Sequence, residues 1–206
     1  MVVDVTKNPI NAKGDSSHDN TAAIETAIDM LRRNGGGTLY FPRGRYLTTQ
    51  RHRISRVPCR IMGDGPGLSA VEWDTEDGGF HFVGGGFSGN NVNSLYVSNL
   101  ALVTHKKLGG VALEMEWDVG NLSAVQHFAI ENTQIKGSTL YVDSNNVTAW
   151  EQGILSIGAY NSTINNVQIL GSSGLSSVEA NGTRGITLQS VPGHQTRATG
   201  IHVSNF

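Results

Sequence analysis

The sequence predicts an all-β solenoid, built from coils of short strands, with a single α-helix near the N-terminus. Two motifs that recur along the second half of the chain support the solenoid. One early amphipathic segment predicts the helix, and no later segment shows helical periodicity over a useful length. A composition of 26 glycines in 206 residues, with only 16% charged residues, suits many short strands joined by turns.

The segment from about Thr21 to Arg33 is expected to be the helix. Its apolar residues recur at i, i+3, i+4 and i+7 and therefore share one face: Ile24, Ala27, Ile28 and Leu31. The side chains of Asp19, Asn20 and Thr21 are suited to accept backbone N–H bonds at its start. Two arginines and three glycines suit its end, and a β-rich run, residues 38–41, follows and is stopped by Pro42.

The repeats predict how the strands stack. A motif of an apolar residue, a polar residue and an asparagine begins at Val97, Ile130, Ile164 and Val203, at intervals of 33, 34 and 39 residues. A second motif, a glycine followed by alternating apolar residues, begins at Gly110, Gly153, Gly185 and Gly200. Strand-type units at a nearly fixed period are typical of a solenoid, in which each coil buries its apolar face against its neighbours.

The recurring asparagine predicts a ladder of side chains. Equivalent residues of successive coils stack about 4.8 Å apart. We therefore expect the amides of Asn99, Asn132, Asn166 and Asn205 to bond to one another. A role for these asparagines in binding a ligand is the alternative.

The N-terminal sequence resembles a known family. The succession AKGD, DNTAAI, AID and GGGTLYFPRGRYL, with IMGDGPGLSAVEW at residues 61–73, resembles the pectate-lyase-like right-handed parallel β-helix proteins, which include phage tailspikes. The resemblance implies a right-handed parallel β-helix whose open end is capped by the helix. It implies one domain over residues 1–206, with a loop and capping helix in 1–37 and coils in 38–206. Because the last repeat stops at Phe206, we expect a longer polypeptide or a partner chain over that end.

The resemblance also implies a function. It indicates a phage tailspike-like protein that binds a bacterial surface polysaccharide and, in its complete form, depolymerises it by hydrolysis or lyase-type cleavage. Such spikes are homotrimers of the virion tail, and other phage tail proteins are expected partners. The N-terminus MVVDVTKNP lacks the basic and apolar regions of a signal peptide, which favours the spike over a secreted lyase or hydrolase. A noncatalytic receptor-binding or structural spike is a third hypothesis.

Charge and cysteine content exclude other classes. A net charge of −2 gives nonspecific nucleic-acid binding no electrostatic support, and no apolar run approaches the roughly 18 residues of a membrane span. The single cysteine, Cys59, excludes an intrachain disulfide and predicts a buried small hydrophobe. Arginines and His52 crowd residues 43–60, either as solvated edge and turn positions or as a surface for an anionic glycan or an acidic protein surface.

One row of acids is the catalytic candidate. Glu114, Glu116 and Asp118 alternate with apolar residues along a predicted strand that starts at Gly110, in which we expect Val111, Leu113, Met115 and Trp117 to point inward. Residues two apart on a strand lie about 6.6–6.8 Å apart at Cα, and inverting glycosidases place their two carboxyl groups about 6.5–9.5 Å apart. Ordinary solubilising acids are the alternative.

A second row, Glu72, Asp74 and Glu76, alternates with Val71, Trp73 and Thr75, which are expected to point inward. The three acidic side chains are expected to point outward, and one possible arrangement places this row beside the first row. Either row suits a calcium ion, and no other cofactor is indicated.

Further candidates bind substrate. Tyr141 with Asp143, and Trp150 with Glu151, place an aromatic ring near a carboxylate, which suits a sugar site, although core packing explains Trp150 equally well. Lyase chemistry needs a base and a cation beside the uronate carboxylate, and the basic turn 105–107 is a candidate for it. The remaining histidines, His81 among them, show no metal-ligand spacing and are expected to be surface or core residues.

Overall fold

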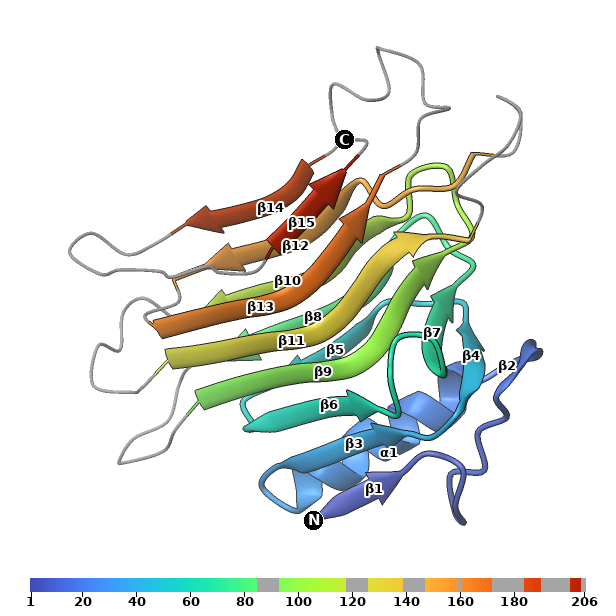
Figure 1. Cartoon of the computed structure of the whole chain (residues 1–206). Coiled ribbons are helices and arrows are strands. Elements are labelled where there is room, and N and C mark those ends of the chain that lie inside the picture. The colour runs from blue at the N-terminus through green and yellow to red at the C-terminus, as the bar shows by residue number, and fades with distance from the viewer. Residues whose placement is uncertain are drawn as a thin grey trace.

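Every strand pairing in the described part of the chain is parallel, and the strands form two curled sheets (Figure 1). The computed structural model describes residues 1–84, 93–117, 126–138, 147–158, 161–171, 184–189 and 201–204. We name the ten-stranded sheet sheet A and the five-stranded sheet sheet B. This arrangement is the parallel β-helix expected from the sequence.

Sheet B has one strand from each successive coil. Its order is β14 (Arg184–Gln189), β12 (Gln152–Ile157), β10 (Gly110–Trp117), β8 (Gly78–Gly84) and β5 (His52–Ser55). Since β5 is the last strand of this order, one edge of sheet B faces the N-terminal end of the molecule.

Sheet A is branched. Its main path is β1 (Val2–Asp4), β3 (Gly37–Phe41), β6 (Cys59–Gly63), β9 (Asn93–Thr104), β11 (Gln126–Gly137), β13 (Asn161–Leu170) and β15 (Ile201–Ser204). The branch is β2 (Asp15–Asp19), β4 (Gly44–Thr48) and β7 (Ser69–Trp73). The first half of β9 pairs with β6 and its second half with β7. Each later coil therefore adds one long bent strand where the early coils have two short ones.

An asparagine ladder lies at the bend of the long strands. Asn99, Asn132 and Asn166 have φ angles of 58°, 45° and 50°, in the left-handed region that turns a strand sharply. The amide of Asn132 donates to Asn99 Oδ1 at 2.7 Å, and that of Asn166 donates to Asn132 Oδ1 at 3.1 Å. The predicted ladder is confirmed for these three residues, and Asn205 lies outside the described residues.

The core fills the space between the two sheets. Trp73 is fully buried, and its ring meets Phe80 at 5.1 Å and Trp150 at 5.6 Å in edge-on geometry. Cys59 is buried as predicted, and burial raises the pKa of its thiol to about 12. Because one apolar cluster extends from Val3 to Ile169, the described coils share a single core.

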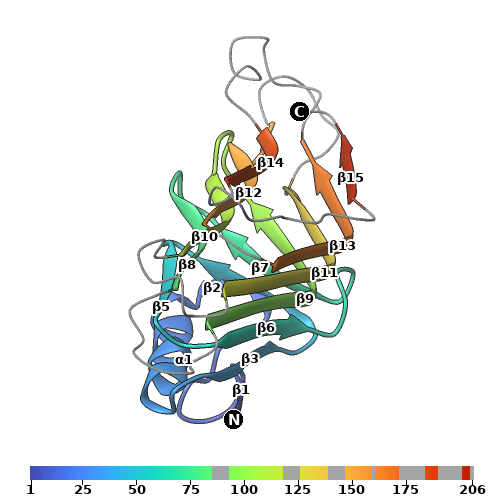
Figure 2. The ribbon, with the colours of Figure 1, turned by 90° about the vertical axis from the view of Figure 1, so that its left-hand side faces the viewer.

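The single helix, α1 (Thr21–Arg33), lies at the N-terminal end of the coils, next to β5 (Figure 2). Its predicted apolar face is buried and joins the core: Ile24, Ala27, Ile28 and Leu31. The helix therefore covers the end of the core as a cap, with the bounds expected from the sequence.

The start of α1 differs in one respect from the expectation. Asp19 accepts the backbone N–H of Thr21 at 2.9 Å, as predicted. Asn20 forms no side-chain cap, because its amide bonds to the backbone of Lys13, His18 and Leu47. Asn20 thereby fastens the preceding segment to β4.

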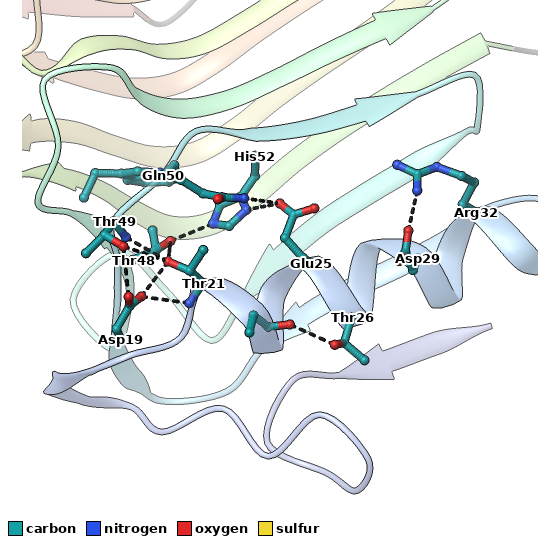
Figure 3. Close-up of polar contacts among 12 residues, drawn as sticks. Asp19, Thr21, Glu25, Thr26, Asp29, Arg32, Thr48, Thr49, Gln50 and His52 are labelled. Carbon is teal, nitrogen blue, oxygen red and sulfur yellow. Dashed lines mark hydrogen bonds and ion pairs between the residues drawn. The ribbon is translucent and has the colours of Figure 1, made fainter.

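Polar contacts tie the exposed side of α1 to the sheets (Figure 3). His52, at the start of β5, contacts Glu25 of α1 through Nδ1 at 2.5 Å and Thr48 through Nε2 at 2.8 Å. Thr49 donates to Asp19 at 2.9 Å, which fixes the first turn of the helix. The cap is thus held by hydrogen bonds at its rim as well as by its apolar face.

Three details of the predicted strands are wrong. Residues 1–37 contain β1 and β2 besides the loop and the helix. The last repeat is misaligned, because β15 pairs Val203 with Ile169 of β13 and the Gly200 motif joins sheet A instead of sheet B. A register irregularity between Gly110 and Leu113 buries Ala112 and leaves Val111 half-buried, whereas Leu113, Met115 and Trp117 point inward as expected.

The ladder yields a test of the bend. Asn132→Ala removes two ladder bonds and places a residue with a Cβ but no compensating amide at positive φ, so we expect a loss of about 2 kcal/mol in unfolding free energy. Asn132→Gly relieves the backbone strain but not the lost bonds, and should cost less. Urea unfolding of the two variants measures this order. Equal stability of the alanine variant and the parent would contradict the role of the ladder.

Candidate functional site

The outer face of sheet B carries a row of polar residues from three coils. Arg53 of β5 lies beside His81 of β8, and His81 lies beside Glu114 of β10 in the strand register. Glu116 follows two residues after Glu114 on the same face of β10. We call these residues, together with Arg51, the sheet-B cluster.

Ion pairs connect the members of the sheet-B cluster. Arg51 contacts the carboxylate of Glu114 and also that of Asp77, the latter at 3.0 Å. Glu116 Oε2 lies 3.4 Å from His81 Nε2, a contact too long for a good hydrogen bond. Arg53 is exposed and has no ion pair with any described residue. The cluster therefore combines a free cation, a paired cation and a histidine that contacts a carboxylate.

The surroundings of His81 favour its uncharged form. Burial, followed by the positive charge of Arg51, lowers its pKa from the ordinary value of 6.5, and the contact with Glu116 opposes this only in part. The Nε2 atom is buried, while the side chain as a whole is 20% exposed. We assign the proton to Nε2, facing Glu116, which leaves the Nδ1 lone pair for a ligand.

The predicted catalytic acids lie in this cluster, but not as an isolated pair. The Glu114 side chain is 17% exposed and engaged by Arg51, whereas Glu116 is 53% exposed. Asp118 lies outside the described residues, as do Tyr141 and Asp143. Glu151 is exposed, and its backbone carbonyl accepts the Arg184 N–H at 2.9 Å.

Trp150 lies in the core instead of on a sugar-binding surface. Its side chain is fully buried, and its Nε1–H donates to the backbone carbonyl of Leu102 at 3.3 Å. Core packing, the alternative at the sequence level, accounts for this residue. No ring face is open for a pyranose to stack on.

The second acid row is neither uniformly outward nor beside the first. Glu72 belongs to β7 of sheet A, and its side chain is completely buried beneath Arg45, Ser16 and His105. Burial alone would raise the pKa of Glu72, but hydrogen bonds from His105, Ser16 and Arg45 lower it to about 2. Glu72 is therefore a fixed negative charge that orients Arg45. The expectation failed because the segment of β2 covers this face.

Asp74 and Glu76 follow the end of β7 and are exposed. Lys106, in the basic turn after β9, pairs with Asp74 at 2.8 Å. Trp73 and Val71 point inward as predicted, while Thr75 is half-buried. Among the residues that the structure describes, no group of three or more His, Cys, Asp or Glu side chains is placed to hold a metal ion.

The arginine-rich segment divides between the two faces. Arg45 lies on the outer face of sheet A, whereas Arg51 and Arg53 belong to the sheet-B cluster. His52 is buried against α1. Sequence reasoning missed Arg51, Arg53 and His81 as one group because lateral neighbours in a parallel sheet come from different coils. The strand register carries that signal, and local spacing does not.

One further constellation resembles a catalytic relay. Thr48, His52 and Glu25 are hydrogen-bonded in series, as a hydroxyl nucleophile, a base and an acid would be. Both Thr48 and His52 are completely buried, so a substrate has no access to the hydroxyl. These residues fasten α1, as Figure 3 shows.

Within the described ranges, no helix has the length and apolar character needed to cross a membrane.

Comparison with known proteins places the chain in a family. The model of the rhamnogalacturonase A/epimerase, pectate lyase-like family matches residues 6–205. Three proteins of Azotobacter vinelandii are similar over shorter stretches. Alginate lyase 7 is 54% identical over 73 residues, which are 31% of this chain and 8% of that protein.

The other two relatives are epimerases. Mannuronan C5-epimerase AlgE2 is 32% identical over 84 residues, 36% of this chain and 8% of the relative. Mannuronan C5-epimerase AlgE3 is 46% identical over 76 residues, 34% of this chain and 4% of the relative. The matched stretch thus covers less than a tenth of the length of each relative. No solved structure matches significantly. The parallel coils, the capping helix and a family match over nearly the whole sequence together show that this chain belongs to the rhamnogalacturonase A/epimerase, pectate lyase-like family.

Proposed function

We propose that this chain binds a polyuronate and acts on it at the sheet-B cluster, by removing the proton at C5 of a uronate unit. The observation that carries the proposal is the placement of His81, which lies beside Arg53 in the strand register and 3.4 Å from the Glu116 carboxylate, while no described residue forms an ion pair with Arg53. Burial lowers the pKa of His81, which favours its uncharged form. Support for the substrate class comes from the relatives, whose names are alginate lyase and mannuronan C5-epimerase.

The chemistry requires two groups that the cluster contains. A proton beside a carboxylate becomes acidic when a cation neutralises that carboxylate, since the negative charge that develops is then stabilised. Arg53 is free for this role, and the uncharged His81 accepts the C5 proton at Nδ1. Glu116 acts through His81, as a positioning residue that stabilises the imidazolium formed.

Two outcomes follow from the same intermediate. If the C4–O4 bond breaks, its electron pair leaves with the oxygen, which takes a proton from water, while a C4=C5 double bond forms and the polymer is cleaved by elimination. If water on the opposite face gives a proton to C5 instead, the sugar is epimerised and the polymer stays intact; in both cases the His81 imidazolium then returns its proton to solvent. Ultraviolet absorbance of the unsaturated product and the count of new reducing ends distinguish these outcomes.

Hydrolysis by Glu114 and Glu116 is the second candidate. The spacing of two residues along a strand suits the carboxyl separation of an inverting glycosidase. The contact between Glu114 and Arg51 favours the first proposal, because a glycosidic oxygen would have to compete with the guanidinium for that carboxylate.

Substitution of His81 tests the base. His81→Ala should lower turnover of a polyuronate by about 10²- to 10⁴-fold while binding is retained. His127→Ala, which changes a histidine on sheet A, is the matched control and should keep parental turnover. Circular dichroism confirms that both variants are folded. Undiminished turnover in His81→Ala would refute the assignment.

The pH dependence gives an independent readout. Since His81 must be uncharged and its pKa is lowered, kcat/KM should hold as the pH falls to 6.5 and decline only below it. Arg53→Gln removes one of the charges that lower this pKa and should move the decline to higher pH. A decline that begins well above pH 6.5 in the parent would contradict the role of His81.

A narrower proposal is that the chain is part of a phage tailspike, which the resemblance of the N-terminal segment to such proteins supports. In this proposal, the chain is part of a homotrimeric spike in a phage tail that acts on a bacterial surface polysaccharide. Light scattering tests it: a particle three times the chain mass of 22.0 kDa is expected. A monomer at micromolar concentration would favour a secreted enzyme of the same family.

A further inference from the structure

A cavity of about 260 Å³ lies on the outer face of sheet A, over β4, β7 and the second halves of β9 and β11. It lies apart from the sheet-B cluster, since its strand residues belong to sheet A. It is lined by small apolar residues on its floor, by Leu68 on its rim, and by the cations Arg45 and Lys136. Its volume is below the roughly 300–1,000 Å³ of pockets for drug-sized ligands and suits one sugar unit.

The floor of the cavity is apolar. Ala70, Ala101 and Val103 form a buried cluster of their own, outside the main core. Ala70 and Ala101 are neighbours in the strand register, and their small side chains leave the hollow. Leu68 stands on the rim with 46% of its surface exposed, one of three large apolar side chains exposed in the described residues. This lining suits the C–H face of a pyranose ring.

Two cations flank this floor. Arg45 of β4 binds Glu72 through Nε at 2.5 Å, and no described residue bonds to its terminal nitrogens. Lys136 of β11 is half-buried and makes no hydrogen bond or ion pair with any residue that the structure describes. Three strand spacings and two residues along the strand direction, roughly 16 Å at Cα, separate the two, so both long side chains can reach a ligand on the floor.

The charges of the cavity do not balance. Glu72 offsets Arg45, whereas no carboxylate of the described residues forms an ion pair with Lys136. Burial, and then the charge of Arg45, lower the pKa of Lys136, although Glu72 opposes this shift. A bound anion would remove the cost of holding this lysine partly buried beside an arginine.

We propose that this cavity binds one carboxylate-bearing sugar unit, with the carboxylate between Lys136 and Arg45 and the ring on Ala70 and Ala101. Glu72 holds the arginine in position. The Ser138 hydroxyl, which lies 3.3 Å from Thr148 Oγ1, borders the cavity. That the sugar belongs to a polyuronate rests on the proposed function. The cavity binds the polymer on sheet A, and the sheet-B cluster remains accessible for the reaction. A long polyuronate that contacts both sites therefore binds more tightly than one that contacts a single site.

Calorimetry with a mannuronate tetrasaccharide tests the site, with a neutral mannose tetrasaccharide as the uncharged analogue. Lys136→Met keeps the side-chain length and removes the charge. It should weaken binding of the mannuronate tetrasaccharide by about tenfold or more. Lys7→Met, at an exposed lysine next to β1, should leave the affinity unchanged. Equal binding of both tetrasaccharides, or no effect of Lys136→Met, would overturn the proposal.

Two further arms separate the possible failures. Binding by His81→Ala that depends on Lys136, in a protein without lyase or epimerase activity, would uphold the cavity and reject the proposed function. Activity that depends on His81, without any effect of Lys136 on binding, would do the reverse. Sulfate is the third probe: if sulfate binds at Lys136 and the tetrasaccharide does not, the cavity is an inorganic-anion site and the sugar assignment falls.

Discussion

The structure depends on the register between successive coils. Each strand pairs with its counterpart one coil away, so identical positions stack and the apolar side chains form one continuous core. The asparagine ladder maintains this register at the bend, where three consecutive coils place an amide at positive φ and bond it to the next. Without that bend, the long strands of sheet A would not curl around the core.

The same register assembles the functional surfaces. Parallel pairing places Arg53, His81 and Glu114 side by side although they come from three coils, and it places Glu72, Val103 and Lys136 in a comparable row on sheet A. What differs between the two faces is the cover. Glu72 is covered by Arg45 and by the segment of β2, so that it is a fixed negative charge. Glu116 is exposed to solvent beside His81. The chemistry of each acid follows from this cover.

The sequence predicts those features that depend on short-range periodicity. The helix, its buried face, the asparagine ladder and the inward direction of Trp73 and Met115 all follow from spacing within one segment or between equivalent repeats. Alternation along a strand says only which side of the sheet a residue faces. It does not show that β2 lies over Glu72, that a register irregularity buries Ala112, or that Arg51 reaches Glu114 across two strands. Those features depend on contacts between segments far apart in the chain.

Proton exchange at C5 of the substrate is the most direct test of the sheet-B cluster as a site of uronate chemistry. A mannuronate polymer incubated with the protein in deuterated water is followed by NMR of the sugar. The account predicts loss of the C5 proton signal, either through deuterium entering at C5 or through formation of the C4=C5 double bond. A polymer that binds and keeps all its C5 protons would contradict it.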